Sequence, residues 1–178
     1  MELGRFRVLV FLAITLVIAA PAALTGQTIS VTVDATKTQQ KLLSAREIIP
    51  VKPGPLTLYY PKWIPGEHAP GGPIASLTGL KFEADGKAIP WVRDLLDVYT
   101  FHLEIPAGVS RLDAKYDYIE PDGVSATDKL LVLEWNEVIL YPAGAPAQQL
   151  TYEAKIHMPD GWKFGTSLPV EKQSGNQV

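Results

Sequence analysis

The sequence predicts an all-β protein, an antiparallel β-sandwich or saddle-like sheet domain of about eight strands. Short segments with alternating apolar and polar residues recur along the chain. Clusters of Pro, Asp and Gly separate these segments, as is typical of turns between strands. After residue 27 no long segment carries apolar residues at helical spacing. Together these observations indicate sheets rather than helices.

The first strand is predicted at residues 28–35, where isoleucine and valine alternate strictly with threonine and serine, so that one face is buried. The second strand is predicted at residues 42–51. Leu42 and Leu43 are compatible with a helix. Pro50 and the β-branched residues around it favour an extended strand instead.

The remaining strands are predicted where β-branched, aromatic and other apolar residues gather between turn signals. These strands cover residues 56–60, 78–84, 98–105, 111–119, 130–135 and 150–157. The turn signals are Asp85-Gly86, Pro106-Ala107-Gly108, Pro121-Asp122-Gly123 and Pro159-Asp160-Gly161.

Only residues 94–97 and 125–131 are compatible with a helical turn. The sequence contains no internal repeat, and about 150 residues are enough to bury roughly 70% of the unfolded surface in one domain. One β-domain is therefore predicted over residues 27–170. Residues 171–178 are predicted to be a polar tail or the truncated start of a linker to a further domain.

The N-terminus has the pattern of a secretory signal peptide. Arg5 and Arg7 precede an apolar run from Val8 to Ala20, which is shorter than the roughly 20 residues of a membrane span. Ala20 and Ala22 form an A-x-A cleavage signal, and a cut before residue 27 fits as well. A signal peptide is predicted at residues 1–26, with export to the periplasm or the extracellular space; the alternative is an uncleaved anchor.

The overall charge excludes some classes of partner. The chain has 16 Lys and Arg against 19 Asp and Glu, a net charge of -3, and its basic residues are dispersed. This pattern disfavours nucleic acid as a partner, and disfavours a membrane once the signal peptide is removed. The absence of cysteine excludes disulfides, thiolate zinc sites and a cysteine nucleophile.

Residues with catalytic or metal-binding chemistry occur without a recognised spacing. His68, His102 and His157 are far apart, and no H-E-x-x-H or H-x-H pair is present. No serine lies in a G-x-S-x-G context. Glu134 and Glu137 are three residues apart, and residues three apart on a strand point to opposite faces rather than across a sugar cleft. No catalytic residue and no metal ligand is assigned.

The aromatic residues are spread over most predicted strands, and we expect most of them in the core. Tyr116 and Tyr118 share one face of a strand, as do Tyr99 and Phe101. Such stripes also suit a platform for carbohydrate, so this alternative stays open.

The most distinctive segment is the run from Leu58 to Pro73, LYYPKWIPGEHAPGGP, which carries a single tryptophan, Trp63. Its prolines fix φ and remove backbone donors, whereas its glycines permit unusual conformations. A stiff surface loop is predicted. Such loops serve ligand sites and domain contacts alike.

The pattern L-x-x-P-x-W-x-P-G in this run, formed by Leu58, Pro61, Trp63, Pro65 and Gly66, resembles the N-terminal domain of the glycyl aminopeptidase family of zinc metallopeptidases. The chain departs from many relatives at His68, where they have tyrosine. The resemblance continues at Arg93, Asp94, Asp97, Val98, Tyr99, Phe101, Trp135, Leu140-Tyr141-Pro142, Pro159 to Lys163 and Thr166 to Leu168.

The resemblance implies a non-catalytic β-domain of a secreted aminopeptidase-like enzyme. Its partner would be a peptidase catalytic domain, in cis or in trans, whose substrate cleft it helps to wall. That domain would hold the zinc, so no cofactor is expected in this chain, which ends before it. Pro61, Trp63, Pro65, Gly66 and His68 are predicted as family-signature or interface residues. The alternatives are a free-standing secreted β-sandwich module that binds carbohydrate or peptide, and a small hydrolase with converged active residues.

Overall fold

The computed structural model describes residues 28–121 and 125–178. The predicted signal peptide lies outside these residues, and so do Asp122 and Gly123 of one predicted turn. Among the residues described, no helix is long and apolar enough to span a membrane.

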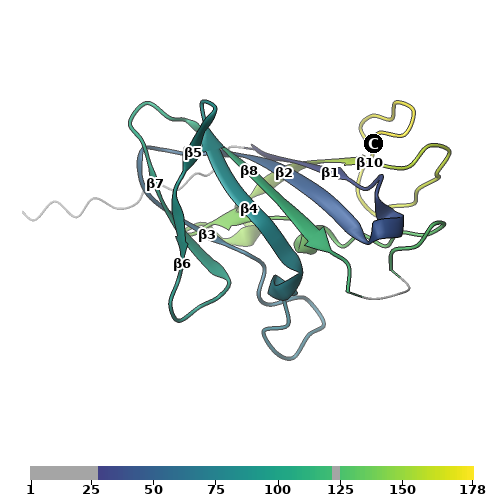
Figure 1. Cartoon of the computed structure of the whole chain (residues 1–178), viewed down its shortest axis with the longest axis horizontal. Helices are drawn as coiled ribbons and strands as arrows, with labels where there is room; N and C mark the ends of the chain where they lie inside the picture. Colours follow the sequence, from purple (N-terminus) through teal and green to yellow (C-terminus); the bar gives the residue numbers. More distant parts are fainter. Residues whose placement is uncertain (1–27, 122–124) are drawn as a thin grey trace, which may run out of the picture.

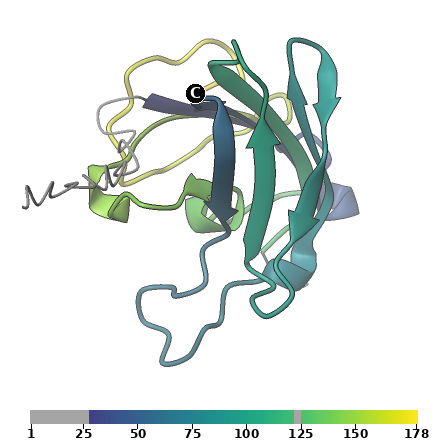
Figure 2. The same cartoon turned by 90° about the vertical axis from the view of Figure 1, so that its left-hand side faces the viewer.

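The domain is built from two β-sheets, which confirms the predicted all-β class (Figures 1 and 2). The six-stranded sheet has the order β10-β1-β2-β8-β4-β5, and the four-stranded sheet has the order β6-β7-β3-β9. Neighbouring strands are antiparallel, except that β1 and β10 are parallel. The strands are β1 (Thr28–Asp34), β2 (Leu42–Pro50), β3 (Gly54–Tyr59), β4 (Leu77–Ala84), β5 (Lys87–Ile89), β6 (Trp91–Arg93), β7 (Thr100–Ile105), β8 (Arg111–Ile119), β9 (Tyr141–Pro142) and β10 (Thr151–His157).

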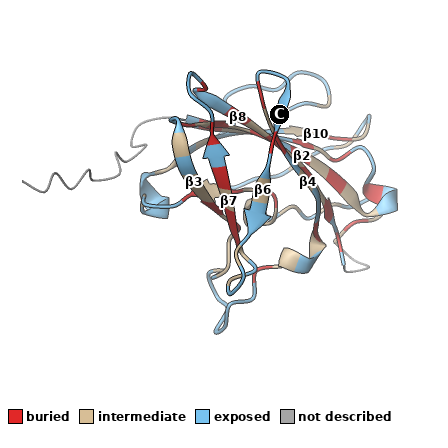
Figure 3. Ribbon diagram, turned by 60° about the vertical axis from the view of Figure 1, so that its left-hand side comes forward, coloured by how far each residue is buried: buried red, intermediate tan, exposed pale blue. Residues whose placement is uncertain are grey.

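The core lies between the two sheets, and strand alternation produces it. On β1 the isoleucine and valines that alternate with threonine and serine are buried, and the same period holds along β8. Figure 3 shows the buried residues as bands along the strands, with exposed residues between them. Tyr60, Tyr118, Phe82 and Phe101 are the largest fully buried side chains.

The chain passes from one sheet to the other at short corners. Pro90 separates β5 of the larger sheet from β6 of the smaller one. Because proline has no N–H to donate to a ladder, it suits a place where one strand ends and the next begins in another sheet. At the predicted turn between β4 and β5, Asp85 and Gly86 both have positive φ, 49° and 74°. That conformation is characteristic of a tight hairpin turn.

The predicted strand at residues 130–135 is wrong. Leu131 forms only an isolated bridge with Ala126, and a 3-10 turn, η3 (Trp135–Glu137), follows. Apolar side chains on this segment pack against the core although its backbone joins neither sheet. Three strands were not predicted, namely β5, β6 and β9, because two or three residues are too few to show a period.

No helical turn forms at residues 94–97 or 125–131, the two segments compatible with one. Asp94 accepts hydrogen bonds from the backbone of its own turn, and Thr127 donates its N–H to the Leu130 carbonyl, 2.8 Å away, so local side chains and turns satisfy these backbones instead. The 3-10 turns lie elsewhere: η1 (Thr38–Gln40), η2 (Ile74–Ser76), η3 and η4 (Ala147–Gln149).

The C-terminal residues return to the free edge of β10. The N–H of Ile156 donates to Val178 O at 2.8 Å, the N–H of Val178 donates back to Ile156 O at 3.1 Å, and Met158 N–H donates to Asn176 O at 2.9 Å. These bonds cover part of an edge whose N–H and C=O groups would otherwise be open to another chain.

Candidate functional site

The Trp63 loop (residues 61–73) connects β3 to η2 and projects beyond the sheets (Figure 2). Its backbone is closed on itself: Gly72 N–H donates to Lys62 O at 3.1 Å, and Glu67 N–H donates to Ile64 O at 3.0 Å. The Trp63 side chain is 65% exposed. The predicted surface loop is therefore present, and it exposes its tryptophan to solvent.

Gly72 marks the tightest point of the Trp63 loop. A Cβ atom at this residue would lie 1.9 Å from the carbonyl oxygen of Pro61. The backbone of Pro61, on the opposite side of the loop, thus leaves no space for a side chain at residue 72. This close approach explains a glycine here in physical terms.

A second exposed element lies at the same end of the domain, the β6–β7 turn (residues 94–99). Asp94 Oδ1 accepts the N–H groups of Leu96 and Asp97 at 2.8 and 2.9 Å. Leu95 and Leu96 are 98% and 97% exposed. The turn therefore has a defined backbone that holds two adjacent leucines in water.

The Trp63 loop and the β6–β7 turn are braced against each other. Lys62 Nζ forms an ion pair with Asp97 Oδ2 at 3.1 Å and lies 5.4 Å from the centre of the Tyr99 ring. The Tyr99 hydroxyl donates to the Gly72 carbonyl at 3.0 Å. We call this pair of braced elements the loop end; Figures 1 and 2 show both on the same side of the sheets.

His102 ties the β6–β7 turn to the outer face of the smaller sheet. Its Nε2 lies 2.9 Å from Asp94 Oδ2, and its Nδ1 lies 3.1 Å from Thr57 Oγ1. The hydrogen bond with His102, followed by those from the Leu96 and Asp97 amides, lowers the pKa of Asp94 to about 2. The order hydroxyl, imidazole, carboxylate also occurs in hydrolases. Here Asp94 accepts the two turn amides through Oδ1 and meets His102 through Oδ2, so the three side chains connect the turn to β7 and β3. We infer that Thr57, His102 and Asp94 position the β6–β7 turn.

The three histidines lie on different elements. His68 is exposed in the Trp63 loop, His102 is on β7, and His157 ends β10 opposite Asp34 of β1. Within residues 28–121 and 125–178, no group of three or more His, Asp or Glu is arranged to hold a metal ion.

Glu134 and Glu137, the candidate pair for glycoside chemistry, lie at a 3-10 turn and not on a strand. The argument that they point to opposite faces of a strand was therefore wrong. Glu134 precedes η3 and is exposed. Glu137 ends η3 and accepts a hydrogen bond from the Tyr118 hydroxyl at 2.9 Å. The Glu137 carboxyl group is thereby hydrogen-bonded to a buried tyrosine of the core.

The aromatic stripes considered as a carbohydrate platform belong to the core. Tyr116, Tyr118 and Phe101 are 3%, 1% and 0% exposed. Tyr99 is partly exposed, but its hydroxyl braces the loop end. These side chains offer no open aromatic surface to a sugar.

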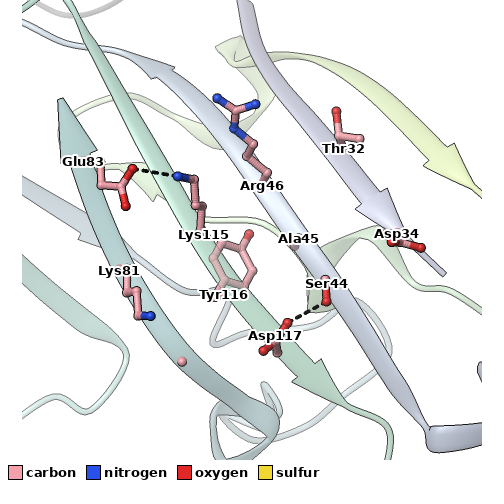
Figure 4. A pocket seen from close by; sticks show the side chains of 11 residues that line it. Thr32, Asp34, Ser44, Ala45, Arg46, Lys81, Glu83, Lys115, Tyr116 and Asp117 are labelled. Carbon is pink, nitrogen blue, oxygen red and sulfur yellow. Dashed lines mark hydrogen bonds and ion pairs between the residues drawn. The ribbon is translucent and has the colours of Figure 1, made fainter. Parts of the chain in front are cut away.

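A shallow hollow lies on the solvent face of the larger sheet, over β2, β8 and β4 (Figure 4). Lys115 and Glu83 face each other across it at 2.6 Å, and Ser44 donates to Asp117 at 2.7 Å. Arg46, at its rim, forms an ion pair with Asp113 at 2.7 Å. Because opposite charges alternate and pair across the strands, we read this face as a solvated surface of the sheet.

Sequence reasoning singled out the Trp63 loop but missed the leucines of the β6–β7 turn. The signal was present as Leu95-Leu96 between Asp94 and Asp97. Because turns lie on the surface, two adjacent apolar residues between turn-forming aspartates are candidates for exposed apolar side chains. No finding tests the assignment of Pro61, Trp63, Pro65, Gly66 and His68 as interface residues, which stays a prediction.

Comparison with known proteins points to peptidases. The sequence model of the peptidase M61 N-terminal domain matches residues 30–178. No curated protein matches the chain. Among solved structures, an aminopeptidase N family protein from Idiomarina loihiensis is similar over 84% of this chain, with a TM-score of 0.62 and 16% identity. An M1 zinc metallopeptidase from Deinococcus radiodurans matches over 82% of this chain and 36% of its own, with a TM-score of 0.40 and 12% identity. The chain spans 26% of the Idiomarina protein's length.

Proposed function

Since the chain belongs to the peptidase M61 N-terminal domain family, we propose that it is the non-catalytic β-domain of an exported, aminopeptidase-like metallopeptidase. In this proposal the domain packs on a catalytic domain and helps to form the wall of its substrate cleft. The zinc and the groups that activate water belong to that catalytic domain. This domain supplies shape and contact area.

The observation that carries the proposal is the loop end. Trp63, Leu95 and Leu96 are large apolar side chains, each at least 65% exposed. They lie on backbones held by an ion pair and by side-chain hydrogen bonds. Large apolar side chains exposed at one end of a domain are characteristic of contact surfaces, and a tryptophan is a frequent anchor. Pro61, Pro65 and Gly66 shape the loop, and His68 is exposed on it.

The test is the association between this domain and the catalytic domain of the full-length enzyme. Changing Trp63 to alanine is expected to weaken association by about 2 kcal/mol or more, which is roughly 30-fold in Kd, if Trp63 is an anchor. The double change Leu95→Ser with Leu96→Ser should have an effect of similar size. Calorimetry or surface plasmon resonance on separately produced domains measures this.

The matched control is Leu130→Ala, because Leu130 is also large, apolar and 51% exposed but lies outside the loop end. It should leave association unchanged. Equal Kd values for wild type, Trp63→Ala and the double serine variant would contradict the docking proposal. Chelator-sensitive cleavage of glycyl or alanyl anilides by this chain alone would contradict its non-catalytic role.

We also propose that the protein is exported, on the strength of Arg5, Arg7 and the apolar run that follows. The mature protein should then begin close to residue 23 or at residue 27. The mass of the exported protein tests this, and an intact N-terminus would contradict cleavage.

A further inference from the structure

Glu47 is a fully buried carboxyl group in the middle of the larger sheet. It lies on β2, between Val31 of β1 and Ala114 of β8, and is 0% exposed. Its Oε2 accepts the N–H of Leu140 at 2.8 Å. Its Oε1 is buried and accepts no hydrogen bond from the residues that the structure describes. An acidic group in such a place is costly unless something compensates it.

A segment outside both sheets covers Glu47. Residues 137–140 precede β9 and lie against the sheet through side-chain hydrogen bonds rather than through a ladder. The segment is held by tyrosine hydroxyls, which donate to its carbonyls: Tyr60 to Glu137 at 2.9 Å, Tyr116 to Val138 at 2.8 Å and Tyr152 to Leu140 at 2.9 Å. Glu47 adds the bond to the Leu140 amide.

The groups that face Glu47 are neutral. They are the hydroxyls of Tyr116 on β8 and Tyr152 on β10, and burial raises the pKa of both. No ion pair of Glu47 is present among the described residues. Burial raises the pKa of Glu47 to about 8, and the hydrogen bond from the Leu140 amide only partly opposes this. The geometry and the charge balance therefore agree on a protonated side chain at neutral pH.

We propose that Glu47 is a proton-operated latch: protonated, it fastens residues 137–140 onto the larger sheet, and loss of its proton to solvent frees that segment. A proton on the carboxyl group explains why Oε1 can be buried without accepting a hydrogen bond. In this proposal the proton sits on Oε1, and the Tyr116 hydroxyl, which interacts with Glu47 and donates its own hydrogen to Val138, keeps lone pairs that can accept it.

The segment is the part that moves because β2 is paired on both sides, with β1 and β8. Water can reach an ionised Glu47 by displacing residues 137–140, which breaks a few side-chain bonds, whereas opening the sheet would break two ladders. The movement would extend to the root of the Trp63 loop, since Tyr60 bonds to Glu137 and immediately precedes that loop. The latch does not depend on the docking proposal.

The first test compares wild type with Glu47→Gln, which keeps an acceptor for Leu140 but cannot ionise. The pKa of Glu47 lies above its ordinary value of 4.5, so the folded state holds a proton that the unfolded state releases. Stability is then full below about pH 4.5 and decreases as the pH rises towards 8. The unfolding equilibrium constant of wild type should rise by about tenfold per pH unit across this window relative to Glu47→Gln. The exposed Glu104→Gln is the matched control and should behave as wild type.

The second test needs no variant. The side-chain carboxyl carbon of Glu47, observed by NMR, should titrate near pH 8, and the Leu140 amide should lose its protection from hydrogen exchange as it does so. Titration close to pH 4.5 would overturn the proposal. So would a Leu140 amide that stays protected through the titration, after correction for the intrinsic exchange rate, because Glu47 would then ionise without releasing the segment.

Discussion

Replacing Phe101 with alanine is expected to lower the free energy of unfolding by about 3–5 kcal/mol, the range for large aromatic residues deleted from a core. Phe101 is 0% exposed, and its ring meets Trp91 edge-on at 5.5 Å between centroids. Trp91 in turn meets Phe82 of the other sheet at 6.2 Å. The row of three rings thus joins β4 of one sheet to β6 and β7 of the other, and the change removes one end of it. Urea unfolding followed by circular dichroism measures the loss.

The control for Phe101→Ala is Val92→Ala. Val92 lies on the neighbouring strand, β6, but is 64% exposed. A surface truncation of this kind should change stability by at most about 0.5 kcal/mol. If the two variants were equally stable, the ring row would not be part of the core that joins the sheets.

Changing Gly72 to alanine is expected to force the Trp63 loop out of its closed conformation. The new Cβ would lie 1.9 Å from Pro61 O and 2.9 Å from Pro61 C, both backbone atoms. Because the clash is between backbone atoms and the new Cβ, no side-chain rotation can relieve it. Overpacking of this kind should lower the free energy of unfolding by about 1–3 kcal/mol. The bond from Gly72 N–H to Lys62 O should be lost with it. Urea unfolding and hydrogen exchange at Gly72 measure the two effects.

The adjacent glycine is the matched control. A Cβ at Gly71 would come 2.5 Å from Glu67 Oε2, the end of a flexible side chain that can move aside. Gly71→Ala should therefore leave stability and loop protection nearly unchanged. Equal effects at the two positions would show that composition, rather than the close approach at Gly72, shapes the loop.

Much of the fold was predictable from the residues alone because its signals are local. Alternation along β1 and β8 identifies a buried face wherever a strand has several residues. Asp85-Gly86 marks a hairpin because few residue pairs tolerate positive φ at both positions. The tryptophan, prolines and glycines of residues 61–73 likewise indicate a stiff loop before any contact is known.

The segment before β9 was not predictable in the same way. Residues 130–135 have the apolar residues of a strand but join neither sheet. In residues 137–140, which follow, hydroxyls from Tyr60, Tyr116 and Tyr152 bind the backbone carbonyls. Propensity describes what a backbone prefers locally. It does not say whether a neighbouring strand will be available for pairing, and here the core supplied side-chain donors instead.

The sequence by itself determined the all-β class, the long strands, the turns and the position of the Trp63 loop on the surface, since each depends on residues adjacent in the chain. Only the tertiary structure decided that Lys62 and Tyr99 brace that loop against Leu95 and Leu96, and that Glu47 is buried beneath Leu140 without a cation. Those arrangements join residues tens of positions apart. Their energies come from desolvation and close approach, which exist only once the two sheets have packed.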